Sequence, residues 1–161
     1  MGSFKISKAG RGDVDLLLAH RQKMWLGIHP ELEKEVKGSE EMTRDWIKRR
    51  LSEGRLVGFI AKTSEGKVAG SGCIWIREEQ PRPTSAHLEV PYLMSMYTVK
   101  TFRRRGVGKL IVKRAIKWSR ERGYEGIVLH ASNEGRPLYE GLGFEPANEM
   151  KLKLQAVPHS K

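Results

Sequence analysis

The chain has only one cysteine, Cys73, among its 161 residues. A single cysteine excludes an internal disulfide, and a chain of this length can bury roughly two thirds of its unfolded surface without one. Long apolar runs are lacking too: none approaches the ~20 residues that a membrane-spanning helix needs, and the N-terminus has no signal-peptide core. We therefore expect one domain over residues 1–161 in a reducing, cytoplasmic setting, with no membrane partner and with residues 156–161 as a disordered tail.

Metal ligands at a recognisable spacing are also absent. The chain has five histidines, His20, His29, His87, His130 and His159. No two of them are spaced as in His-x-x-x-His, and Cys73 has no second thiol, so we predict no metal site. His130 lies between Leu129 and Ala131 in an apolar segment, which favours a core histidine over a catalytic base.

Acidic residues are few compared with basic ones, 19 against 30, and the formal net charge is +11. Between Lys100 and Arg122, ten basic residues accompany a single acid, Glu121. This excess suits a phosphate-bearing ligand, although a solvated helix face is the simpler interpretation for each basic residue singly. A nucleic-acid-binding domain would need aromatic residues among the basic ones, and after Phe102 this segment has only Trp118. Nucleic acid is therefore the less favoured partner.

The basic residues surround a glycine loop that follows an apolar strand and opens an amphipathic helix. The loop is Arg103-Arg-Arg-Gly106-Val-Gly108-Lys109. Free N–H groups at a helix start bind phosphate oxygens, and glycines let the backbone approach such a ligand closely. A dinucleotide fingerprint would need a third glycine where Ile111 stands, and a nucleotide P-loop would need Ser or Thr in place of Leu110. Neither of the common nucleotide motifs fits.

The pattern Arg-x-x-Gly-x-Gly, from Arg103 to Gly108, resembles the pyrophosphate-binding motif of the GNAT superfamily of N-acetyltransferases. A second stretch resembles the next signature of that family: an apolar strand, 126–132, then Asn133, a short helix carrying Leu-Tyr139, and Leu-Gly-Phe. The resemblance implies acetyl-CoA as co-substrate. It implies that the residues in contact with the coenzyme are Tyr97, Thr98, Val99, Arg103, Arg104, Arg105, Gly106, Val107, Gly108, Lys109, Asn133 and Tyr139.

The order of the expected elements agrees with that family. Alternation and apolar spacing predict strands at 4–8, 56–63, 67–77, up to 99, at 126–132 and at 150–154, with helices at 13–25, 39–51, 106–122 and about 137–140. Ser39 is the expected N-cap of the second helix. The polar segment from Ile28 to Gly38 is interpreted as a lid over the acceptor site. The expected fold class is α/β: a single GNAT-like domain with a mixed, mostly antiparallel twisted sheet flanked by helices.

The resemblance also implies the reaction, direct transfer of an acetyl group to a primary amine. The backbone near Tyr97 would polarise the thioester carbonyl, and Tyr139 would be the general acid that protonates the leaving thiolate, or else an aromatic anchor of the short helix. Many relatives carry a glutamate that acts as the general base on the strand where this chain has Met94, Ser95 and Met96. Glu89 is our first candidate for the base, ahead of Glu79, Glu78 and His87, and a weakly basic acceptor amine would need none.

Two further side chains, Asn133 and Cys73, each have a chemical and a structural interpretation. Asn133 either hydrogen-bonds the pantetheine or caps the short helix. Cys73 lies in a hydrophobic strand, which argues for packing rather than an acyl-carrying nucleophile.

The acceptor is not encoded in a motif. Trp25, Met24, Trp75 and Tyr92 either line an apolar pocket or belong to the core. A small-molecule amine is favoured over a protein, and a homodimer is left open. The competing class is a non-catalytic acetyl-CoA-binding sensor module, because the usual strand carboxylate is missing.

Overall fold

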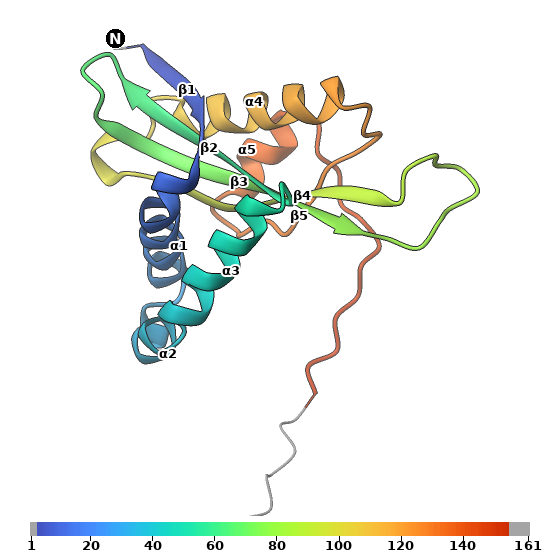
Figure 1. Cartoon of the computed structure of the whole chain (residues 1–161), viewed down its shortest axis with the longest axis horizontal. Helices are drawn as coiled ribbons and strands as arrows, with labels where there is room; N and C mark the ends of the chain where they lie inside the picture. The colour runs from blue at the N-terminus through green and yellow to red at the C-terminus, as the bar shows by residue number, and fades with distance from the viewer. Residues whose placement is uncertain (1–2, 155–161) are drawn as a thin grey trace, which may run out of the picture.

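The computed structural model describes residues 3–154, so the tail expected at 156–161 lies outside the described part. It contains a five-stranded sheet in the order β1-β2-β3-β4-β5 (Figure 1). The first four strands are mutually antiparallel and β5 runs parallel to β4. The strands are β1 (Phe4–Lys8), β2 (Leu56–Thr63), β3 (Val68–Glu78), β4 (Glu89–Thr98) and β5 (Val128–Leu129). The mixed, mostly antiparallel sheet is as expected from the sequence.

Helices cover both faces of this sheet. Helix α4 packs on one face over a core that includes Phe59 and Ile74 of the sheet (Figure 1). Helices α1 and α3 pack on the other face, where Leu17, Leu18 and Ile47 contact Leu56 and Cys73 of the sheet (Figure 1). The α-helices are α1 (Val14–Ile28), α2 (Glu33–Gly38), α3 (Glu40–Ser52), α4 (Val107–Glu121) and α5 (Arg136–Gly141). The described residues contain no helix whose length and apolar character would let it cross a membrane.

Helix ends follow from local chemistry, with one departure from expectation. Helix α4 begins after Gly106 and is followed by Gly123, both at positive φ (+79° each), where glycine is free of the strain that a Cβ would add. Ser39 stands at the N-cap position of α3, but its hydroxyl donates to the carbonyl of Val36 instead of capping the helix. The segment expected as a lid is itself helical, with a 3-10 turn, Pro30–Leu32, leading into α2.

Strand β4 carries a bulge at the point where the sheet meets the candidate site. Ser71 pairs with Tyr97 and Cys73 with Met94, so two residues of β4, Ser95 and Met96, face Gly72 alone. Ser95 has a φ of +55°, an uncommon value for a residue with a side chain. Bulges of this kind re-aim side chains and are common next to active sites.

Strands β4 and β5 separate soon after they pair. Their register joins Tyr92 to Val128 and Leu93 to Leu129, and no further pair is formed. Beyond Leu93, the edge of β4 that faces β5 is therefore open, and its backbone groups are available to an extended ligand.

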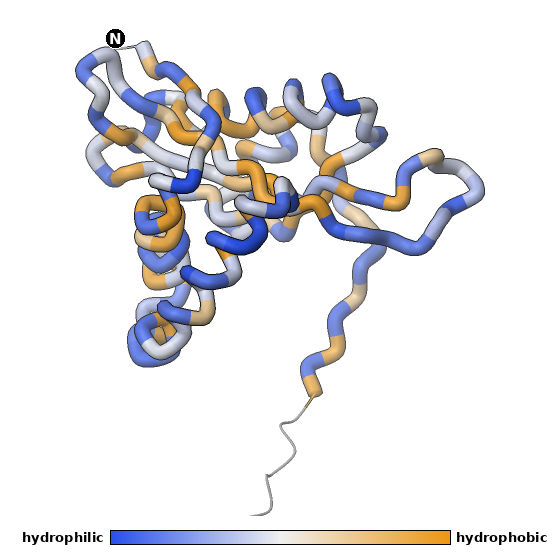
Figure 2. The backbone as a smooth tube through the Cα atoms, in the orientation of Figure 1, coloured by the Kyte–Doolittle hydropathy of each residue, from blue (hydrophilic) through white to orange (hydrophobic). Residues whose placement is uncertain are grey.

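The prediction of a strand at 150–154 is wrong: these residues are extended (Figure 1) but pair with no strand of the described chain. Met150, Leu152 and Leu154 are 95%, 83% and 79% exposed, and apolar and polar positions alternate along this part of the chain (Figure 2). Similarly, the expected strand 126–132 is reduced to the two residues of β5. Alternation describes a strand only where a partner supplies the hydrogen bonds.

Candidate active site

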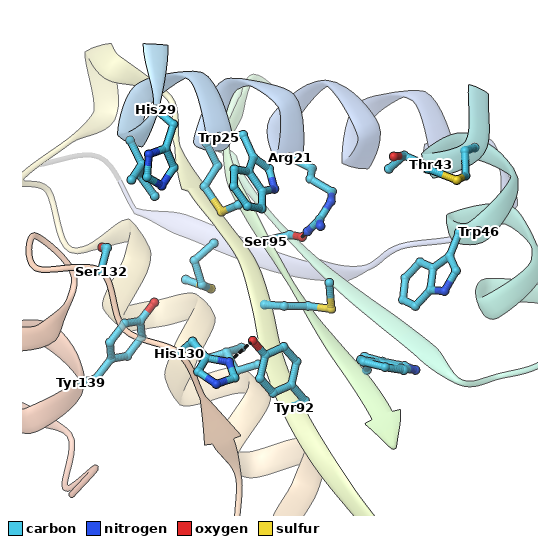
Figure 3. Close-up of a pocket in the computed structure, with 17 residues that line it drawn as sticks. Arg21, Trp25, His29, Thr43, Trp46, Tyr92, Ser95, His130, Ser132 and Tyr139 are labelled. Atoms are coloured by element: carbon cyan, nitrogen blue, oxygen red, sulfur yellow. Dashed lines mark hydrogen bonds between the residues drawn. The ribbon is translucent and has the colours of Figure 1, made fainter. Parts of the chain in front are cut away.

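A cavity of about 780 Å³ lies between α1, α3, β4, α5 and the chain that follows β5 (Figure 3). Its walls are largely apolar. The apolar side chains are Met24, Trp25, Ile28, Met42, Trp46, Trp75, Leu93, Met94 and Met96. The sequence did not decide whether four large side chains line a pocket or belong to the core. All four line this cavity: Trp25, Met24, Trp75 and Tyr92.

Charge in the cavity wall is of one sign. Arg21 lines it, and none of the lining residues in the described chain is a carboxylate. The Nη1 group of Arg21 donates to the Ser95 hydroxyl over 3.0 Å, and its guanidinium lies 5.9 Å from the centre of the Trp25 ring. The bulge thus turns the Ser95 hydroxyl toward Arg21 (Figure 3). Burial lowers the pKa of Arg21 from its ordinary value, as expected for a guanidinium without a nearby anion.

A chain of hydrogen bonds joins Tyr92, His130 and Glu149 at the floor of the cavity. The Tyr92 Oη atom is 2.6 Å from His130 Nδ1, and His130 Nε2 is 3.0 Å from Glu149 Oε1 (Figure 3 shows the first bond). Because a carboxylate only accepts, a neutral His130 carries its proton on Nε2 and accepts the Tyr92 hydroxyl at Nδ1. Burial is the main cause of the raised pKa of Tyr92.

His130 therefore does not occupy the core position that its apolar neighbours predicted. Its side chain is 60% exposed and lines the cavity. The reason is that β5 ends at Leu129, so His130 lies just past the sheet, where the chain turns toward α5. No spacing in the sequence links it to Tyr92 or to Glu149, which are 38 and 19 residues away.

Tyr139 lines the same cavity from α5, and its hydroxyl is directed into it (Figure 3). Its ring packs edge-on against Phe144, with centroids 5.8 Å apart. Within residues 3–154 the Tyr139 hydroxyl has no hydrogen-bond partner, and burial raises its pKa above the ordinary value. Tyr139 thus has both a packing contact and an unpartnered hydroxyl in the described chain, so its interpretation as an aromatic anchor is compatible with its interpretation as a general acid.

Glu89 is held elsewhere. It begins β4, opposite Glu78, and is not among the residues that line the cavity. Its carboxylate is ion-paired with Arg55 and accepts the Tyr124 hydroxyl at 3.0 Å. The hydrogen bond from Arg55 is the main reason why the pKa of Glu89 lies below its ordinary value. The structure thus brings the two candidate catalytic residues to different places, Tyr139 in the cavity and Glu89 outside it.

The basic glycine loop adjoins α5. A Cβ at Gly108 would lie 3.4 Å from the side chain of Leu138, the residue before Tyr139. The first bond of α4 runs from the Leu110 N–H to the Gly106 carbonyl, which leaves the N–H groups of the preceding turn without a partner inside the helix. The loop and the cavity therefore flank the same short helix.

The side chains of the loop differ in their freedom. Arg103 donates from Nε to the Thr98 carbonyl at 3.1 Å, and Arg105 stacks on Phe102 at 5.6 Å. Arg104, at a φ of +59°, is exposed, as is Lys109. Val107 is buried in the core, so only its backbone can reach a ligand. Further along α4, Lys113, Lys117 and Arg120 are exposed, as a solvated helix face would be.

Two polar side chains near the cavity have clear structural roles. The Ser132 hydroxyl accepts the Gly135 N–H at 3.1 Å, so Ser132 stabilises the turn before α5 that was considered for Asn133. Asn133 is exposed. Cys73 is buried, which raises the pKa of its thiol to about 12, and a thiol in that state is a poor nucleophile.

Comparisons with known proteins agree over most of the chain. A sequence profile of the acetyltransferase (GNAT) family matches residues 19–144. The glucosamine 6-phosphate N-acetyltransferase of Trypanosoma brucei brucei is 26% identical over 145 residues, which are 88% of this chain and 96% of that protein. A GCN5-related N-acetyltransferase structure from Ralstonia eutropha matches with a TM-score of 0.84 at 26% identity, over 94% of this chain and 99% of its own. A predicted acetyltransferase from Clostridium acetobutylicum, solved with acetyl-CoA, gives 0.82 at 26% identity, over 95% and 96% of the two chains.

Proposed function

Because this chain belongs to the acetyltransferase (GNAT) family and is thus an acyltransferase, we propose that it moves an acetyl group from acetyl-CoA directly to a primary amine of a small molecule. One observation carries the proposal: α5 adjoins both the basic glycine loop and the cavity, so a coenzyme whose phosphates lie at the loop could extend its thioester end toward Tyr139. A cavity of about 780 Å³ suits a small acceptor. The similar T. brucei protein is named for a small amine substrate, glucosamine 6-phosphate.

The residues of the loop fit the phosphates of the coenzyme. The N–H groups of Val107, Gly108 and Lys109 have no partner inside the helix and lie at the start of its 15 residues, where its dipole favours anions. Arg104 and Lys109 are exposed and add charge beside them. The open edge of β4, near Tyr97 and Thr98, offers backbone groups to the extended arm of the coenzyme. When bound, acetyl-CoA supplies the acetyl group as a thioester.

Three proton transfers accompany the exchange of bonds, in which the C–N bond forms and the C–S bond breaks: nitrogen loses one proton before it attacks and a second as the amide forms, and sulfur gains one. The second proton from nitrogen replaces, through solvent, the one that Tyr139 gives to the sulfur. The Tyr139 hydroxyl donates its proton to the departing sulfur; its raised pKa keeps it protonated at neutral pH. On the acceptor side, the Tyr92 oxygen takes a proton from the ammonium group of the acceptor as its own proton passes to His130 Nδ1. Glu149 then stabilises the imidazolium from the other side of the ring. This chain of bonds takes the place of the strand carboxylate, and we assign the role of base to it rather than to Glu89.

Calorimetric titration with acetyl-CoA, in parallel with duplex DNA at physiological salt, tests the proposal. We expect micromolar coenzyme binding that Gly108→Asp weakens at least 30-fold, because it adds bulk and negative charge beside the phosphates. Gly108→Ala controls for bulk, since a Cβ there makes only ordinary contacts, and Lys113→Gln controls for the loss of one positive charge on the same helix. Salt-sensitive DNA binding without coenzyme binding would overturn the proposal. Coenzyme binding without acetylation of any amine would indicate a sensor module instead.

A further inference from the structure

Among the basic side chains that line the cavity, Arg21 is the one without a carboxylate partner in the described chain. The two other basic side chains in the wall each have a carboxylate beside them: His29 lies 3.2 Å from Glu31, and His130 lies 3.0 Å from Glu149. Arg21 has five N–H donors, and within residues 3–154 it uses one, on the Ser95 hydroxyl. A partly buried guanidinium with free donors is an incomplete ion pair unless a ligand supplies the anion.

The cavity therefore disfavours the binding of an amine whose only charged group is its ammonium. An acceptor whose only charge is its ammonium group would enter a wall that holds a guanidinium and no carboxylate. An acceptor that also carries an oxyanion would pair this group with Arg21, so that the guanidinium no longer repels the ammonium group. Planar carboxylates and phosphates match the fork of an arginine, which binds both through paired N–H donors.

The remaining walls describe the body of the ligand. Trp25, Trp46 and Trp75 come from three different elements, α1, α3 and β3, and line the cavity together with the methionines. Aromatic and thioether surfaces of this kind bind flat apolar groups, and methionine side chains adapt to their shape. A sugar-like body with many hydroxyls would find few polar partners on these walls.

The position of Arg21 also limits the distance between the two charged groups of the acceptor. Arg21 is bonded to Ser95, and Tyr97, near which the thioester carbonyl is expected, is two residues further along β4. Two residues span at most about 7 Å even in a fully extended chain, and the bulge at Ser95 shortens this distance. An anionic group on Arg21 and an amine at the thioester are therefore separated by a few bonds, as in an α- or β-amino acid.

From these contacts we infer that the acceptor is an amine that carries an oxyanionic group close to its nitrogen and an apolar, preferably aromatic, body, and that Arg21 is the specificity-determining residue that binds the oxyanion. This inference rests on the proposed N-acetyltransferase function.

Matched pairs of ligands that differ only in the anionic group test the inference. L-Tryptophan is compared with tryptamine, and L-phenylalanine with phenethylamine, by thiol release and by mass spectrometry of the product. We expect kcat/KM to be at least 100-fold higher for the member with the carboxylate. Glucosamine 6-phosphate against glucosamine forms the phosphate arm. If only glucosamine 6-phosphate is preferred over its uncharged partner, the inference that the acceptor carries an oxyanion would stand, and the inference that its body is apolar would be overturned.

A binding measurement makes the test independent of turnover. N-Acetyl-L-tryptophan and N-acetyltryptamine are titrated calorimetrically in the presence of CoA, and the first is expected to bind at least 10-fold more tightly. Arg21→Met should abolish this difference, Arg21→Lys should keep part of it, and Lys23→Met, an exposed change on the same helix, should leave it intact.

The outcomes separate the two levels of inference. Equal affinities for the two products, or a difference that survives Arg21→Met while acetyl-CoA still binds, would overturn the role of Arg21 and leave the acetyltransferase function standing. Loss of acetyl-CoA binding by the unmodified protein would instead remove the function on which the inference rests. Acetyl-CoA binding by Arg21→Met also shows that this variant is folded.

Discussion

The hydroxyl of Tyr139 is free of hydrogen bonds in the described chain and projects into a cavity whose wall holds no carboxylate. We predict that Tyr139→Phe lowers kcat about 100-fold and leaves the affinity for acetyl-CoA unchanged, because the ring still packs on Phe144 while the proton donor is lost. Steady-state kinetics together with calorimetry measure the two quantities. Equal turnover by the phenylalanine variant would leave Tyr139 only its packing role.

Individual residues also show where sequence reasoning stops. The glycine loop and Tyr139 could be proposed from the sequence because they belong to local motifs, in which the candidate groups are close along the chain. His130 was misjudged because its immediate neighbours are apolar, whereas its partners Tyr92 and Glu149 lie 38 and 19 residues away. Arg21 has no motif around it at all; only the fold brings it to Ser95, 74 residues further on.

At the scale of elements, the hydrogen-bond chain that we propose as a proton relay connects β4, the end of β5 and the segment before Met150. We predict that Tyr92→Phe and His130→Gln each lower kcat roughly 10- to 100-fold and that the double variant loses no more than the worse single one, since both interrupt one chain of bonds. Glu149→Gln should cost less, and Glu145→Gln, an exposed carboxylate in the same segment, should cost nothing. Losses that multiply in the double variant would mean that the two residues act separately.

The elements themselves were largely predictable. The first four strands and the four main helices appear within a few residues of the expected bounds, because each has a continuous apolar face that the sheet or a neighbouring helix covers. The end of the chain was not predictable in this way. Strand β5 pairs over two residues only, and the pattern at 150–154 has no partner in the described chain, which a sequence window cannot reveal.

At the scale of the whole molecule, a buried histidine couples stability to pH. His20 on α1 is 4% exposed, lies 2.7 Å from the Ser71 hydroxyl on β3, and has a pKa lowered to about 4, chiefly by burial. The unfolded chain has the ordinary value of about 6.5, so between these values it binds a proton that the folded protein does not. Above pH 6.5 His20 is neutral in both states, and as the pH falls toward 4 the folded state loses up to about 3 kcal/mol.

A comparison with His20→Asn measures the contribution of His20 to the pH dependence of stability. We predict that the free energy of unfolding, from denaturant titrations, falls between pH 7.5 and pH 4.5 by roughly 2 kcal/mol more in the unmodified protein than in the variant. Carboxylates such as Glu89 and Glu40, whose pKa values are lowered by their hydrogen-bond donors, contribute to the loss in both proteins alike. An identical pH dependence in the two would show that His20 does not titrate as its burial requires.

The apolar side chains of Met150, Leu152 and Leu154 have a consequence for how the molecules behave in concentrated solution. Extended segments with exposed apolar side chains and unpaired backbone groups are templates for sheet growth between molecules. Here Lys151 and Lys153 alternate with them, so stacking two such segments would bring like charges together. The positive charge of these two lysines therefore opposes association between molecules, and salt that screens it weakens this protection.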